Sequence, residues 1–124
     1  MRLKLTAVMA AALAWSSVEA AEFPDVATAA QLATLCGARP GEQFYVEASN
    51  FCYGYITGAV QFHNAMVRAG KIKPLACPPP EATRSEFAQY FANWARTRAT
   101  PQQLEEPALE GATRAAAEKY PCPN

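Results

Sequence analysis

Polar side chains between Gln43 and Ala69 recur at steps of three and four residues. They are Glu47, Asn50, Thr57, Gln61, Asn64 and Arg68, and Gly54 occupies the one position where this spacing would place a further polar residue. Nearly every other position in this stretch is apolar, so the spacing predicts one long helix with a narrow polar stripe, ending before Gly70. A helix that is apolar over most of its circumference must be nearly surrounded. We therefore predict that it is the central helix of the domain.

Three further stretches have helical character, and each begins with a threonine suited to an N-cap. One runs from about Thr28 to Cys36 and another from about Thr83 to Arg98, both with Gln or Glu three residues after the threonine. The last runs from Thr100 to near Lys119, and Pro107 should kink or restart it. Strand signals are scarce. The sequence predicts an all-α fold, a small bundle of four helices plus short turns.

The amino-terminal stretch, residues 1–20, has the pattern of a secretory signal peptide. Arg2 and Lys4 precede the apolar run Leu5 to Trp15, and small residues lead up to Ala20. The run is about half the length needed to cross a bilayer. We expect cleavage after Ala20, no membrane anchor, and a periplasmic domain formed by residues 21–124.

Charge and composition narrow the range of partners. Without the signal peptide the eleven basic and eleven acidic residues become nine and ten, so the domain is close to neutral. No basic stripe stands out, which argues against nucleic acid as a partner.

The cysteines Cys36, Cys52, Cys77 and Cys122 form no closely spaced pair. In an exported chain of this size, four cysteines of this kind predict two structural disulfides, and their spacing does not suit zinc. Cys36 ends one predicted helix and Cys52 lies early in the next, while Cys77 precedes the third helix and Cys122 follows the last. If the last two helices are antiparallel, the pairs are Cys36–Cys52 and Cys77–Cys122.

Candidate catalytic residues are few. His63 lies on the apolar side of the long helix, where a buried, hydrogen-bonded core histidine is the main interpretation and a pH sensor or partner contact the alternative. A triad would require Asp25 to reach it from the amino end. The carboxylates Glu105, Glu106 and Glu110 have the pattern of a solvated helix face. We expect no enzyme, no metal and no cofactor.

Gly54 and Gly58 lie four residues apart in the long helix, where each costs about 1 kcal/mol relative to alanine. Their presence suggests that another backbone packs closely there. The neighbour is either a helix of the same chain or a partner chain.

The segment Phe51-Cys52-Tyr53-Gly54-Tyr55-Ile56-Thr57-Gly58-Ala59 is the most specific part of the sequence. Cys77-Pro78, a Thr-capped helix, the Pro101 helix start and Tyr120-Pro121-Cys122 follow it in a familiar order. From about Gln31 to Cys122 the chain resembles the Rap/Tai family of periplasmic immunity proteins. The resemblance implies an all-helical, disulfide-bonded domain, often a homodimer. It also implies a partner: a peptidoglycan amidase effector delivered by type VI secretion, whose active-site cleft the protein blocks.

The loops at both ends of the long helix are the candidate partner contacts. They are Arg39 to Tyr45, with Phe44 and Tyr45, and Lys71 to Leu75, with Lys71 and Lys73. An alternative function is a periplasmic acid-stress chaperone of the Hde type, which would expose apolar surface at low pH. A structural subunit of an envelope complex is a third class.

Overall fold

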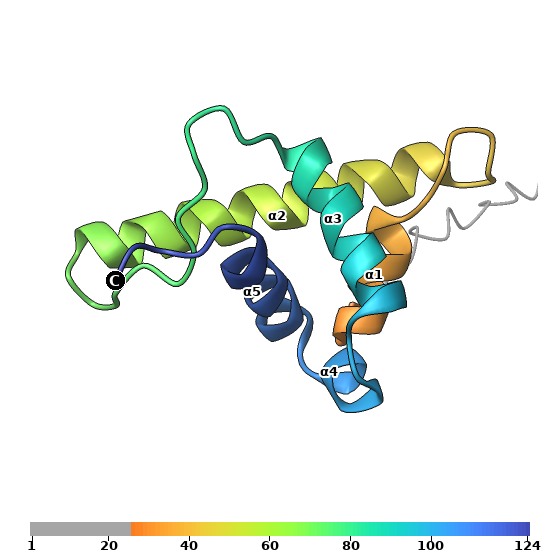
Figure 1. The fold of residues 1–124 in the computed structure, drawn as a ribbon. Coiled ribbons are helices and arrows are strands. Elements are labelled where there is room, and N and C mark those ends of the chain that lie inside the picture. The colour runs from red at the N-terminus through yellow and green to blue at the C-terminus, as the bar shows by residue number, and fades with distance from the viewer. Residues whose placement is uncertain (1–25) are drawn as a thin grey trace, which may run out of the picture.

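The computed structural model describes residues 26–124, which fold into five helices (Figure 1). These are α1 (Ala29–Cys36), α2 (Tyr45–Arg68), α3 (Arg84–Thr97), α4 (Pro101–Glu105) and α5 (Ala108–Lys119). The predicted all-α fold is confirmed. The signal-peptide prediction lies outside the described residues. Within residues 26–124, no helix is both long and apolar enough to cross a bilayer.

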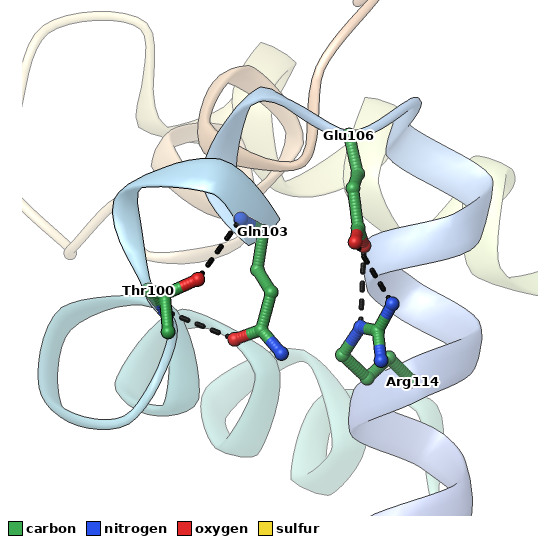
Figure 2. A network of polar contacts seen from close by, with 4 residues as sticks. All are labelled: Thr100, Gln103, Glu106 and Arg114. Carbon is green, nitrogen blue, oxygen red and sulfur yellow. Dashed lines mark hydrogen bonds and ion pairs between the residues drawn. The ribbon is translucent and has the colours of Figure 1, made fainter.

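Threonine N-caps fix where three of the helices begin. Thr28 and Gln31 cap α1 reciprocally, and Thr100 and Gln103 do the same for α4, where each side chain bonds to the other residue's backbone N–H (Figure 2). The hydroxyl of Thr83 accepts the backbone N–H of Glu86 at the start of α3 (3.2 Å). The cap positions predicted from the sequence are therefore found at all three helices.

Pro107 divides the last predicted helix into α4 and α5. Proline has no N–H to donate and cannot continue the helical hydrogen bonds, so the chain restarts at Ala108. Glu106 accepts two hydrogen bonds from the guanidinium of Arg114 across the junction (Figure 2). The backbone of Ala27 accepts the N–H of Ala108 (3.0 Å), which joins the start of the described chain to this junction.

The hydrophobic core lies where α1, α3 and α5 meet. α1 and α5 each pack against α3, and Leu32 and Phe91 are fully buried there. The contact of α1 with α5 is especially close, because a Cβ placed on Gly111 would lie 2.3 Å from the Cβ of Ala29. This three-helix contact is the rigid centre of the domain.

The prediction that the long helix is central is wrong. Of its 24 residues only Cys52 and Ile56 are buried, and both belong to its amino half. α2 packs against α1 and α3, and its carboxyl half extends beyond these helices (Figure 1). The remaining helices bury one another's small and aromatic side chains, so they do not surround α2.

Both disulfides have the predicted pairing. Cys36–Cys52 ties the end of α1 to the amino half of α2, with 5.1 Å between the Cα atoms. Cys77–Cys122 ties the segment before α3 to the segment after α5, with 4.9 Å between the Cα atoms. The antiparallel arrangement assumed from the sequence brings the second pair together.

Candidate functional site

An apolar groove of about 370 Å³ lies beside the carboxyl half of α2. α2 contributes Ile56, Ala59 and Val60 to its lining, and α5 contributes Leu109, Ala112 and Ala116. Ile72, Leu75 and Ala76, from the loop after α2, complete the groove together with the first turn of α3. The size and apolar lining are those of a binding site.

The groove gathers most of the large apolar side chains that the described residues leave exposed. Six are exposed, and four of them line the groove: Val60, Phe62, Leu75 and Leu109. The other two, Phe44 and Val46, lie at the opposite end of α2. Single exposed apolar residues are ordinary, but a contiguous cluster of them is typical of an interaction surface.

Two anchors hold the loop that forms one wall of the groove. The N–H of Leu75 donates to Nε2 of His63 (3.0 Å), while Nδ1 faces the side-chain oxygen of Asn64 (3.2 Å). Because Nε2 accepts, Nδ1 carries the proton of a neutral ring. The N–H of Cys77 donates to the carbonyl oxygen of Tyr120 (2.8 Å) beside the second disulfide. The wall is therefore positioned from both α2 and the carboxyl-terminal segment.

The lining of the groove has one charged side chain, Arg84, which donates to the hydroxyl of Thr57 (3.0 Å), and it contains no carboxylate. Outside the lining, Glu81 and Glu110 are sequence neighbours of lining residues, as Lys71 and Lys73 are. Lys71 and Lys73 lie exposed on the loop. No acidic residue occurs between Glu47 and Glu81 in the sequence. Among the described residues, the ion pairs involve none of these three cations.

Two tyrosines, Tyr55 and Tyr120, contribute to the lining of the groove. Burial raises the pKa of Tyr55 above its ordinary value. The pKa of Tyr120 is also raised, chiefly by burial, with Lys119 lowering it and Glu86 raising it. The hydroxyl of Tyr120 is buried and has no hydrogen-bond partner among the described residues. Both rings therefore stay neutral at physiological pH and contribute mainly apolar surface.

The structure separates the two pairs of candidate contact residues that the sequence suggested. Lys71 and Lys73 flank the groove, whereas Phe44 and Tyr45 lie at the other end of α2, ~36 Å away along a helix of 24 residues. Phe44 is 66% exposed and has a left-handed backbone with φ of 64°. That conformation is uncommon for a bulky residue. The four residues do not form one site.

Gly54 and Gly58 pack against no other helix of residues 26–124. A Cβ placed on either glycine would meet no atom within 4 Å, so this side of α2 is open. Of the two neighbours that the sequence allowed, a helix within residues 26–124 is therefore excluded, and a partner chain stays a prediction. The close approach of two backbones occurs instead at Gly111, which the sequence analysis did not single out.

Two other sequence interpretations are partly correct. His63 is hydrogen-bonded, but it is half-buried at the groove rather than in the core, because the carboxyl half of α2 lies outside the core. Glu105 and Glu110 are exposed as expected, while Glu106 is half-buried and pairs with Arg114. Within residues 26–124, no three His, Cys, Asp or Glu side chains come together as a metal site would require.

Val60 and Phe62 are among the apolar positions of the long helix, all of which the sequence pattern predicted to be covered, so the pattern did not indicate the groove. The lack of carboxylates around them was the sequence feature that could have indicated it.

Comparison with known proteins identifies the family. No curated protein and no solved structure matches the chain. The family model of the Rap1a immunity proteins matches residues 28–122, which include all five helices and both disulfides. The chain belongs to the Rap1a immunity protein family.

Proposed function

We propose that this protein is exported to the periplasm and there binds a secreted peptidoglycan amidase effector, whose active-site cleft it blocks. Membership in an immunity protein family is the observation that carries the proposal. The exposed apolar groove on a doubly disulfide-bonded body supports it, because such a surface can form the centre of an interface.

The proposed mechanism requires no chemistry from this chain. The core of α1, α3 and α5 and the two disulfides keep the binding surface in one conformation, so little entropy is lost on binding. Tight inhibition would need an interface of about 800 Å² per partner with a few apolar or aromatic anchors. The four exposed apolar residues of the groove can supply such anchors.

The direct test uses a secreted amidase encoded next to this chain. The oxidised protein, residues 21–124, is mixed with the purified amidase, and release of peptidoglycan fragments is measured against inhibitor concentration. We expect stoichiometric inhibition and a complex on gel filtration. Full hydrolysis in the presence of excess oxidised protein, with no complex formed, would contradict the proposal.

Export and assembly are tested separately. We also propose that the protein forms a homodimer, as the resemblance to the family implies. We expect protein purified from periplasm to begin at Ala21 by amino-terminal sequencing, and sedimentation to show the homodimer. A retained signal peptide would contradict the proposed export, and a monomer would contradict the proposed assembly, without bearing on inhibition.

A further inference from the structure

We infer that the apolar groove beside the carboxyl half of α2 binds a helical segment of a partner protein that combines an apolar face with acidic side chains. This inference deepens the proposed function and rests on it: the segment would belong to the effector. The apolar lining and the nearby positive charges of the groove are the features that would select this segment.

The shape and lining of the groove suit the apolar side chains of such a segment. Apolar residues of α2 and α5 line it, together with Ile72 and Leu75 of the loop after α2. Val60 is 46% exposed and Leu109 is 45% exposed, so one side chain on each of the two helices can be covered by an incoming segment. Amphipathic helices bind in this way, with apolar residues at every third or fourth position in the groove.

The charges favour an acidic occupant. Arg84 is the only charged residue in the lining, and Lys71 and Lys73 lie exposed on the loop beside it. None of the three takes part in an ion pair among residues 26–124. The chain as a whole has no net charge, so this positive region is local. Opposite charges at the edge of an interface speed association and exclude partners of the wrong sign.

The same charges argue against a second copy of this chain in the groove. In a two-fold symmetric dimer the same patch faces itself. That contact would bring the positive charges of Lys71, Lys73 and Arg84 from both protomers into one interface, and the repulsion between them is unfavourable. An acidic segment from another protein meets no such repulsion.

Two synthetic peptides test the charge selectivity without the amidase. Both carry leucines at positions i, i+3, i+4 and i+7 of a helix, and the remaining positions are glutamate in one and lysine in the other. Calorimetry at low salt should show that the acidic peptide binds at least about tenfold more tightly, and that the difference shrinks as salt is added. Equal affinities, tighter binding of the lysine peptide, or binding of neither would overturn the inference.

The location of binding is tested by amide chemical shifts and by matched variants. The acidic peptide should shift the amides of Val60, Leu75 and Leu109, and shifts confined to other residues would overturn the inference. Val60→Asp and Lys73→Glu should each weaken binding about tenfold. The control variants Val46→Asp and Arg96→Glu make the same changes at exposed positions outside the groove and should bind like the parent.

The same four variants are then tested for amidase inhibition. Loss of inhibition in Val60→Asp and Lys73→Glu alone supports the inference. If the parent inhibits and all four variants inhibit equally well, only this inference fails. If the parent itself does not inhibit, the proposed function fails, whereas the peptide result still stands. A dimeric parent that becomes monomeric in Val60→Asp, or peptide displacement by phosphatidylglycerol vesicles, would show that another occupant fills the groove.

Discussion

The two halves of α2 have similar apolar sequences and different surroundings. In the amino half Cys52 and Ile56 are buried, and a disulfide joins this half to α1. In the carboxyl half Val60 and Phe62 are exposed, and the groove lies beside them. An apolar helical pattern therefore predicts that a face of the helix will be buried. It does not show whether the surface that buries it belongs to the same chain or to a partner.

Removing either disulfide should give the largest changes in the free energy of unfolding. Cys36–Cys52 is attached to the amino half of α2, and Cys77–Cys122 lies beside the loop that follows its carboxyl half. Removing Cys77–Cys122, which spans 45 residues, should lower the free energy of unfolding by about 4 kcal/mol on the loop-entropy model. Removing Cys36–Cys52, which spans 16 residues, should cost about 3 kcal/mol. Double cysteine-to-alanine variants and chemical denaturation measure both values.

Only removal of Cys77–Cys122 should also weaken binding of the acidic peptide, since that disulfide positions the loop beside the groove. Equal loss of peptide affinity in both double variants would contradict the separation of the two halves.

Replacing two glycines by alanine should give the next largest changes in the free energy of unfolding, in opposite directions. Gly111→Ala places a methyl group 2.3 Å from the Cβ of Ala29 and should lower the free energy of unfolding by about 3 kcal/mol. Gly58→Ala meets no atom within 4 Å and should raise it by about 1 kcal/mol through helix propensity. Thermal and chemical unfolding of the two variants test this contrast. A destabilised Gly58→Ala protein would show that α2 is covered at this position in solution.

The local features of the fold could be predicted from the sequence because they depend on neighbouring residues. Thr28 and Thr100 cap helices through residues three positions away, and Pro107 interrupts the last helix through its own missing N–H. The disulfide pairing followed from helix ends brought together by antiparallel packing. These inferences required no knowledge of which faces meet.

The position of α2 could not be predicted, because it depends on how the other helices pack. Gly111 lets α1 and α5 come close together, and both helices pack against α3. The carboxyl half of α2 extends beyond α1 and α3, and the groove lies between it and α5. The periodicity of Val60 and Phe62 is the same whether they face a core or a groove. The groove thus required the tertiary structure, while the role of the nearby Lys71 and Lys73 as partner contacts stays a prediction from the sequence.

The variant Tyr120→Phe tests the state of the buried tyrosine hydroxyl beside the groove. That hydroxyl has no partner among residues 26–124, so Tyr120→Phe should raise the free energy of unfolding by about 1 kcal/mol. Denaturant unfolding measures the change, and Tyr90→Phe is the control at another half-buried tyrosine. A clear loss of stability in Tyr120→Phe alone would mean that the hydroxyl is hydrogen-bonded in solution.

His63 tests how the loop is held against α2. His63→Leu removes the acceptor for the N–H of Leu75 and should cost about 0.5 kcal/mol. The more specific result is faster hydrogen exchange at the Leu75 amide. Asn64→Leu keeps the acceptor nitrogen and should preserve the protection of that amide. Unchanged exchange in His63→Leu would contradict the role of this hydrogen bond.

The smallest expected effect lies at the amino end of α2, where Glu42 accepts hydrogen bonds from the backbone and side chain of Arg39. These bonds lower the pKa of the Glu42 carboxyl below its ordinary value. Since the folded pKa lies below the unfolded one, the stabilisation is present above the unfolded pKa and is lost as the pH falls through the folded value. Glu42 is fully exposed, so the change in stability should be slight.

An NMR titration of the Glu42 side chain should give a lowered pKa in the parent and a value closer to the ordinary one in Arg39→Gln. The same titration should leave the amides of Val60 and Leu109 unchanged, because Glu42 lies beyond the far end of α2 from the groove. If these groove amides move with the titration of Glu42, the two halves of α2 are coupled, and the amino end would contribute to the groove after all.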